Sequence, residues 1–332
     1  MANKAKKTIK KKINQKKRSV KRSKPYQIFL FILVVSLGVY FYLNQEEQAP
    51  PNYSQQQNSE GFYYYTSVPS TDYYGSANDL EGQALLDQLR IIINENVELQ
   101  RYADAKEILA ISDLSIEDSS KVYNIYDGLL VPSIWDSTSW HREHVWPNSR
   151  LGMDRVSESG RNQASDLHNL RAITPSVNSS RSDRFYSDGS GTEDITEDGG
   201  YYPGDDHKGD VARILFYMYT MYDFLELTDE GLEDESNHYT MAGTKMGKLS
   251  LLLTWHKEDP VDAFEIQRNQ VIFEAQGNRN PFIDQPFYVH LIFEDMSIES
   301  LLEPDDEIES SNNHQLHVLM KNRRLFTYVY QV

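Results

Sequence analysis

The chain has 332 residues, of which 39% are hydrophobic and none is cysteine, and its formal net charge is −17 at pH 7. This hydrophobic content is sufficient for a sizeable buried core. The lack of cysteine excludes disulfides and thiolate metal sites, so any metal ion must be bound by His, carboxylate or amide groups.

The N-terminal segment is strongly basic, whereas the body of the chain is acidic. Residues 1–24 contain 12 of the 33 Lys and Arg residues and no acid, which leaves 21 basic and 50 acidic residues in the remainder. An uncharged stretch follows at residues 27–43 and is close to the ~20 residues that span a bilayer. Because basic residues precede it and acidic residues follow it, we predict a cytoplasmic N-terminus (1–24), a transmembrane signal anchor (25–44) and an exported body.

The alternative at this segment is a cleaved signal peptide, which would make the protein secreted. No small-x-small cleavage site follows Leu43, and this favours the anchor. Residues 45–72 are rich in Gln, Ser, Pro and Tyr without helical periodicity, so we expect a flexible tether there.

Helical patterns dominate the body that follows. A helix is expected to begin near Asn78 and to bury one apolar face, which comprises Leu85, Leu86, Leu89, Ile92 and Ile93. Residues 141–175 fit strands and loops, and Thr174-Pro175-Ser176 resembles a helix start. A core helix is expected over 211–225 with Asp210 as its cap.

One more helix is predicted, with Asp259 as N-cap, Pro260 as first residue and Gly277 after the last turn. Many helices with a few scattered strands indicate an α+β fold, in a mostly helical domain over 73–295. Residues 296–332 are acidic and polar before a strand-like end, and we interpret them as a C-terminal extension.

The stretch "HREHVWPNSR" (141–150) concentrates polar chemistry on ten residues. Its His141 and His144 are three residues apart, which does not fit the H-E-x-x-H zinc helix, and the following Trp-Pro would end a helix. On a strand end, Glu143 could bind a hard cation such as Mg²⁺, and His144 could accept a proton near neutral pH. These two functions suit phosphodiester cleavage.

The region around this stretch reverses the charge of the acidic body. Residues 141–186 contain seven arginines and five acids. The planar guanidinium group matches phosphate oxygens, so these arginines favour a phosphate-bearing substrate. Seven solvated surface arginines are the alternative.

Four ordered blocks of sequence resemble the endonuclease I family of His-Me finger (ββα-metal) nucleases. They are "REHVWPNSRLG", "DLHNLRAITPSVNSSRSDRF", "YYPGDDHKGDVAR" and "EDPVDAFEIQRNQVIFEAQGNRNPFID". The resemblance spans residues 73–290 and implies a domain built around a finger of two strands and a helix that holds one divalent ion. It implies that His144 is the general base, that Glu143 and Asn178 are the metal ligands, and that Arg181 lies near the same phosphate.

Further roles follow from the same resemblance. We expect Arg142, Arg150, Arg161 and Arg184 to bind substrate, whereas Asp166, His168 and Asn169 support the finger. Direct chemistry by His168 and Asn169 is the alternative. Some family members have an arginine between the two strands that contacts the cleaved phosphate, and here Arg150, Arg155 and Arg161 all fit that position.

The resulting expectation is a monomeric endonuclease that cuts DNA, with RNA as a second substrate, with little sequence preference. Its expected cofactor is Mg²⁺, or another divalent cation such as Mn²⁺ or Ca²⁺, and no protein partner is expected. We expect the nuclease domain outside the cell, anchored to the membrane through 25–44 or secreted if that segment is cleaved. The alternative function is a non-catalytic, membrane-tethered binding module whose nuclease site has decayed.

Overall fold

The computed structural model describes residues 56–57, 63–64, 73–232 and 243–298. All of them belong to one unit of the chain, which extends from Tyr53 to Val332. The predicted basic segment and anchor, and almost all of the tether and the C-terminal extension, lie outside the described residues. Within the described ranges no helix is both long enough and apolar enough to cross a membrane.

The described chain contains α-helices and short strands, together with four 3₁₀ turns. The α-helices are α3 (Gly82–Asn94), α4 (Ala105–Ser112), α5 (Pro175–Arg181), α6 (Lys208–Met221), α7 (Leu249–Glu258), α8 (Ala263–Gln276), α9 (Pro281–Asp284) and α10 (Tyr288–Phe293). The strands are β1 (Gln56–Gln57), β2 (Tyr63–Tyr64), β3 (Lys121–Tyr123), β4 (Leu130–Pro132), β5 (His141–His144), β6 (Leu170–Ile173), β7 (Asp194–Ile195), β8 (Tyr201–Tyr202), β9 (Glu226–Leu227) and β10 (Lys245–Met246). The 3₁₀ turns are η1 (Gly75–Ala77), η2 (Asn148–Arg150), η3 (Gln163–Ser165) and η4 (Leu167–Asn169).

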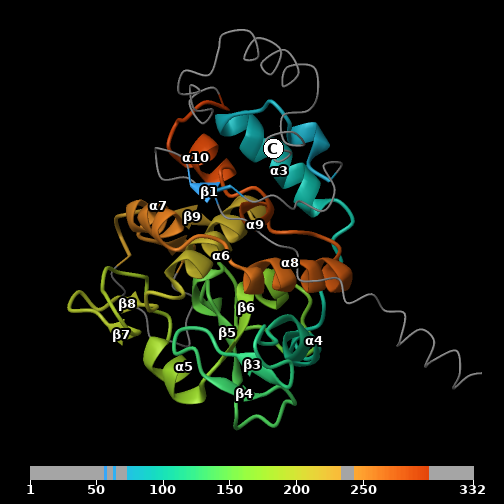
Figure 1. Cartoon of the computed structure of the whole chain (residues 1–332), viewed down its shortest axis with the longest axis vertical. Coiled ribbons are helices and arrows are strands. Elements are labelled where there is room, and N and C mark those ends of the chain that lie inside the picture. The colour runs from blue at the N-terminus through green and yellow to red at the C-terminus, as the bar shows by residue number, and fades with distance from the viewer. Residues whose placement is uncertain (1–55, 58–62, 65–72, 233–242, 299–332) are drawn as a thin grey trace, which may run out of the picture. The chain divides into compact units, whose positions relative to one another are not determined.

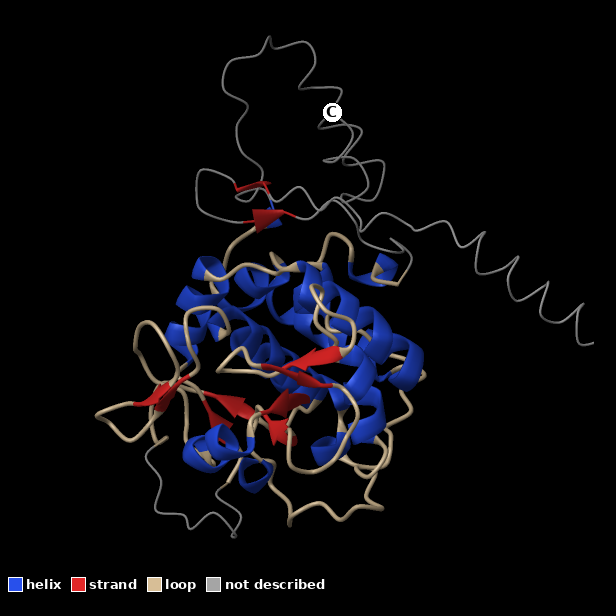
Figure 2. Ribbon diagram, turned by 60° about the horizontal axis from the view of Figure 1, so that its bottom comes forward, coloured by secondary structure: helices blue, strands red, loops and turns tan. Residues whose placement is uncertain are grey.

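Helix α6 is the central element of the core. Nearly all of its residues are buried, because α3, α7 and α9 pack around it. Figure 1 shows the helices α3, α6, α9 and α10 gathered together, with the strands β3 to β6 and the helix α5 on the other side of α6, and Figure 2 shows the short strands beside the group of helices. The strands pair only in twos, and all pairs are antiparallel except β9 with β10. Mixed helix and strand content is therefore observed, as the predicted α+β class requires.

The predicted apolar face of α3 and the predicted start of α5 are confirmed. All five predicted residues of α3 are buried, although the helix begins at Gly82 and not near Asn78. Helix α5 has Thr174 as N-cap and Pro175 as its first residue. The predicted end of α8 is also confirmed, since Gly277 adopts a left-handed conformation (φ 90°) at its C-terminus.

Two predicted caps were wrong. Asp210 lies inside α6, whose N-cap is His207, and its carboxylate pairs with Arg171. Asp259 ends α7, and the N-cap of α8 is Asp262, which forms a capping box with Glu265. The reciprocal Asp262–Glu265 bonds satisfy two free backbone donors at once, which a cap at Asp259 would leave open.

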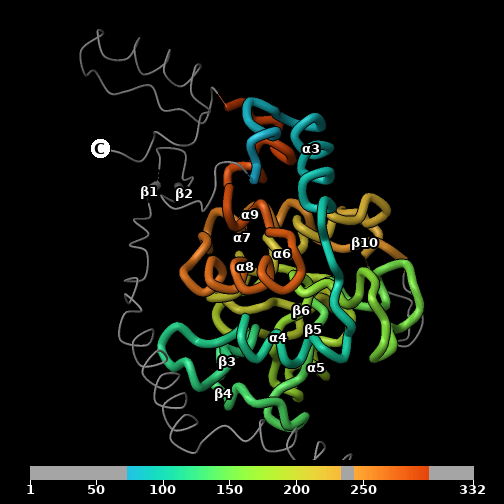
Figure 3. The backbone as a smooth tube through the Cα atoms, turned by 90° about the vertical axis from the view of Figure 1, so that its right-hand side faces the viewer, coloured from blue at the N-terminus to red at the C-terminus, as the bar shows by residue number. Residues whose placement is uncertain are grey.

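Strands β5 and β6 and helix α5 form a ββα unit. The strands are antiparallel, with Glu143 opposite Arg171 and His144 opposite Leu170. Helix α5 follows β6 after one residue, Thr174, and contacts β5. Figure 3 shows the two strands side by side with α5 next to them. This arrangement matches the two strands and helix that the sequence resemblance implied.

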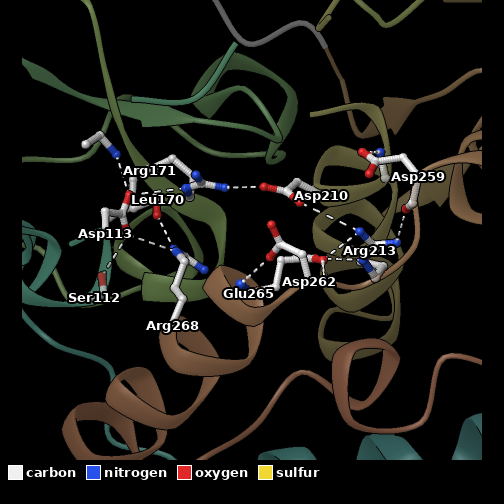
Figure 4. Close-up of polar contacts among 12 residues, drawn as sticks. Ser112, Asp113, Leu170, Arg171, Asp210, Arg213, Asp259, Asp262, Glu265 and Arg268 are labelled. Atoms are coloured by element: carbon white, nitrogen blue, oxygen red, sulfur yellow. Dashed lines mark hydrogen bonds and ion pairs between the residues drawn. The ribbon is translucent and has the colours of Figure 1, made fainter. Parts of the chain in front are cut away.

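A buried network of ion pairs joins β6 to the helices α6 and α8 and to the residue that follows α4 (Figure 4). Arg171 of β6 pairs with Asp113 after α4 and with Asp210 of α6. Arg268 of α8 reaches the same Asp113, 2.9 Å away, and Arg213 of α6 forms a two-pronged pair with Glu265 at 2.6 Å. Buried charges need such partners, so the network holds the ββα unit rigidly against the helices.

Candidate active site

A cavity of about 640 Å³ lies where β5 ends. Three of its lining residues are Glu143, His144 and Asn178, which the sequence analysis assigned to catalysis and metal binding. The others are Tyr102, His141, Arg142, Pro147, Asn148, Ser149, Met153, Asp154, Arg155, Val156, Ser179, Ser182 and Asp183. The fold therefore brings Glu143 and Asn178, which are 35 positions apart in the sequence, to the wall of one cavity.

The hydrogen bond of His144 determines which ring nitrogen is basic. Its Nε2 lies 2.8 Å from the backbone carbonyl oxygen of Ala164. A carbonyl can only accept, so Nε2 carries the proton and Nδ1 keeps a lone pair. Burial lowers the pKa of His144 to about 4, with only the Ala164 contact opposing it, so the ring is neutral at neutral pH. A neutral imidazole in a cavity wall can accept a proton from water.

Glu143 is buried, and two groups contact its Oε1 atom. Tyr126 donates its hydroxyl hydrogen over 2.9 Å, and the Nε atom of Arg181 lies 3.2 Å away. Burial raises the pKa of Glu143 to about 7, while Arg181 and Tyr126 act in the opposite direction. A divalent cation beside this carboxylate would favour its ionised form.

Asn178 lies in the middle of α5 and lines the same cavity. Its side chain makes no hydrogen bond with any residue in the described ranges. A carboxylate and an uncommitted amide oxygen facing one cavity are the donor types that Mg²⁺, Mn²⁺ and Ca²⁺ accept. The described residues contain no cluster of three or more His, Asp or Glu side chains that could bind a metal ion instead. The donor set therefore fits a divalent ion held by Glu143 and Asn178.

Arg181 does not line the cavity. Its side chain is fully buried at the end of α5, where it donates to the carbonyl oxygens of Val145 (2.7 Å) and Ser182 (2.9 Å) and pairs with Glu143. Through these contacts the Arg181 guanidinium holds the end of β5 and the Glu143 carboxylate in place. The geometry thus gives Arg181 a positioning role and leaves it no access to a phosphate in the cavity.

The predicted substrate arginines divide into two groups. Arg142 lines the cavity, where it pairs with Glu158 at 2.8 Å. Arg150, Arg161 and Arg184 do not line it. Arg150 is buried and donates to the carbonyl oxygens of Asp183 and Leu232, and Arg161 donates to that of Leu99.

Arg155 is the arginine of the β5–β6 connection that faces the cavity. It is exposed, lines the cavity and forms no ion pair with a described residue. From the sequence alone, the arginine that contacts the cleaved phosphate could equally be Arg150, Arg155 or Arg161. The structure separates them, because Arg155 alone of the three is both exposed and in the cavity wall.

Asp166, His168 and Asn169 are buried beneath the strands and line no part of the cavity. The Asn169 amide bonds to both the backbone nitrogen (2.7 Å) and the carbonyl oxygen (3.0 Å) of Trp146, two residues after His144. Asp166 accepts hydrogen bonds from Tyr217, Tyr222 and Gln276, each at 2.9 Å. His168 reaches the carbonyl oxygen of Asn278. These contacts fix the chain around β5 and β6.

Three tyrosines at this site were not predicted from the sequence. Tyr126 contacts Glu143 and also lies 2.6 Å from the hydroxyl of Tyr186, which donates to the carbonyl of Val145. The ring of Tyr102 stacks on that of His144, with 5.3 Å between ring centroids. No local pattern distinguishes these residues from the other tyrosines of a chain that contains 22.

Comparison with known proteins gives one family. The family model described as endonuclease I matches residues 81–287. The chain is 37% identical over 235 residues to an extracellular ribonuclease of Bacillus amyloliquefaciens, which covers 66% of this chain and 78% of the relative. It is 28% identical to endonuclease-1 of Buchnera aphidicola (42% and 60% covered) and to an extracellular deoxyribonuclease of Aeromonas hydrophila (36% and 49% covered). The match covers the ββα unit and the cavity described above, and the chain belongs to the endonuclease I family of nucleases.

Proposed function

We propose that the chain is a divalent-metal-dependent endonuclease that hydrolyses phosphodiester bonds of RNA and DNA with little sequence preference. The observation that carries the proposal is the orientation of His144. Its Nε2 proton is committed to Ala164, which leaves Nδ1 as the acceptor in a wall shared with Glu143 and Asn178. A general base needs this combination of free lone pair and access.

In the proposed reaction, His144 Nδ1 removes a proton from a water molecule as the water oxygen attacks phosphorus. The bond from phosphorus to the leaving oxygen breaks, and that oxygen takes a proton from solvent. Glu143 and Asn178 would hold the divalent ion, which supplies positive charge to the scissile phosphate when bound. Arg155 contributes further positive charge at the cavity edge.

Both nucleic acids are proposed as substrates because the relatives' names include an extracellular ribonuclease and an extracellular deoxyribonuclease. Contacts to phosphate groups carry no sequence information, which supports low specificity. The same names support export of this chain. A membrane anchor at 25–44 stays a prediction, since that segment lies outside the described residues.

The test is degradation of structured RNA and of plasmid DNA by the purified full chain, with Mg²⁺, Mn²⁺, Ca²⁺ or EDTA. We expect cleavage of both substrates with at least one ion and none with EDTA. Calorimetric titration of the ion into Glu143→Ala and Asn178→Ala should show weaker binding than in the wild type. Cleavage that persists in EDTA, or unchanged ion affinity in both variants, would refute metal dependence through these residues. A binding module would bind nucleic acid without cutting it under any ion.

A further inference from the structure

Three planar side chains lie close together at the part of the cavity wall that β5 forms. They are Trp135, His141 and Arg142, which we call the Trp135 platform. Arg142 and His141 line the cavity, and the ring centroid of Trp135 lies 6.5 Å from that of His141. The Arg142 guanidinium carbon lies 3.6 Å from the ring centroid of Tyr102 and 5.8 Å from that of Trp135.

Through Tyr102 the platform is continuous with the general base. The Tyr102 ring stacks on His144 with an angle of 25° between the ring planes, and Arg142 lies over the same tyrosine. Planar groups therefore extend without interruption from His144 to Trp135. The Arg142 side chain is only 10% exposed, pairs with Glu158 and packs on Tyr102, so it supports Trp135 and leaves the Trp135 ring as the surface on which a ligand can stack.

Trp135 is held in place and is partly exposed. Trp140, which is fully buried, contacts it edge-on with 4.7 Å between centroids. The loop that carries Trp135 is fixed by Asp136, whose carboxylate accepts hydrogen bonds from the backbone nitrogens of Thr138 and Ser139. Ile134 beside it is 81% exposed, so the surface next to Trp135 is apolar. A preformed aromatic surface loses little entropy when a ligand stacks on it.

We propose that the Trp135 platform stacks an unpaired base of a single-stranded nucleic acid whose backbone enters the cavity. This inference rests on the proposed nuclease function and gives substrate segments with unpaired bases a contact that duplex DNA does not make. A base inside a duplex is stacked on its neighbours and has no free face, whereas every unpaired base offers one. Arg155 in the cavity wall would bind the phosphate next to the stacked base. The Trp135 platform would contact the base itself.

Binding can be measured without cleavage. The full chain with His144→Ala, in EDTA, is titrated with a short single-stranded RNA, a DNA of the same sequence and the corresponding duplexes. The other three tryptophans, Trp140, Trp146 and Trp255, are at most 2% exposed, so quenching of tryptophan fluorescence by a stacked base should come from Trp135. We expect quenching by both single strands and little by the duplexes.

Two variants in the same background complete the test. Trp135→Ala should weaken binding of single strands roughly 5- to 100-fold, the scale of one lost base–aromatic stack, and leave duplex binding unchanged. Trp135→Phe should retain most of the affinity while losing the quenching. Ile91→Ala, at a 62% exposed site on α3, is the matched surface control and should bind like its parent.

Equal affinities of the parent and Trp135→Ala for single strands would overturn the platform. The same holds if duplex binding falls as much as single-strand binding, or if quenching survives in Trp135→Phe. These outcomes are separate from failure of the proposed function. A wild-type chain that cuts nothing with any ion refutes the nuclease reaction even where the platform binds, and a failed platform leaves cleavage intact.

Discussion

The Nε atom of Arg181 lies 3.2 Å from Oε1 of Glu143, and both side chains are almost completely buried. The pair joins the end of α5 to the end of β5, and Glu143 is itself one of the two proposed metal ligands. Removing one member of a buried pair leaves an uncompensated charge, which costs about 3–5 kcal/mol.

Arg181→Met should therefore destabilise the metal-free protein by about that amount, as measured by urea unfolding. Mg²⁺ should restore part of the loss, because an ion at Glu143 replaces the missing positive charge. The double variant Glu143→Gln with Arg181→Met should be more stable than Arg181→Met alone. Arg161→Met, an arginine outside the cavity, serves as control and should change stability by less than ~0.5 kcal/mol. Wild-type stability in Arg181→Met would contradict this role.

The cavity arginine can be tested against its neighbour. Arg155→Ala should raise KM for a nucleic acid substrate and reduce the slope of log affinity against log salt by about one unit, since one phosphate contact is lost. Arg161→Ala removes an arginine of the same connection that lies outside the cavity, and it should leave both quantities unchanged. The comparison is a series of KM values between low and physiological salt. Equal behaviour of the two variants would rule out a specific role for Arg155.

Asp113 is the central carboxylate of the buried network in Figure 4. It accepts bonds from Arg171, Arg268, Ser112 and the backbone nitrogen of Ala172. Asp113→Ala should cost about 3–5 kcal/mol, because two buried guanidinium groups lose this carboxylate and only Arg171 keeps a second one, Asp210. Asp127→Ala, at a loop position, is the control, and thermal unfolding measures both. A loss below ~1 kcal/mol for Asp113→Ala would show that the network does not hold β6.

His168 should make the protein sensitive to acid. Burial lowers its pKa to about 3, whereas an unfolded histidine titrates near ~6.5. The unfolded chain therefore binds this proton more tightly, so the contribution to stability is complete above about pH 6.5 and is lost progressively as the pH falls toward 3. In His168→Gln, which can still donate to Asn278, urea-unfolding free energies should fall less steeply between about pH 7 and pH 4. Parallel profiles for variant and wild type would contradict this assignment.

Local sequence patterns predicted the parts of the site that depend on residues close together in the chain. Glu143 and His144 stand side by side at a strand end, and Asn178 lies one turn into a helix whose start Thr174 and Pro175 mark. These three residues share a cavity because the strand pair and the following helix are a local unit.

The remaining features depend on contacts between residues far apart in the sequence, and local patterns did not predict them. Arg150 and Arg155 are alike in sequence, but Arg150 is buried by carbonyl groups of Asp183 and Leu232, the latter 82 positions away. Arg181 was expected near the phosphate, yet its guanidinium turns inward to Glu143. The start of α8 moved from Asp259 to Asp262 because Asp259 accepts instead from the backbone nitrogen of Gly209 on α6. Such partners cannot be read from local patterns.

The central claim is that His144 is the general base of a metal-dependent nuclease. The most direct measurement is plasmid nicking by the purified full chain and by His144→Ala, each with Mg²⁺ and with EDTA, after circular dichroism has shown that both are folded. We expect nicking by the wild type only with the ion and a rate at least ~10²-fold lower in the variant, the scale of a lost general base. A folded His144→Ala that nicks at the wild-type rate would contradict it.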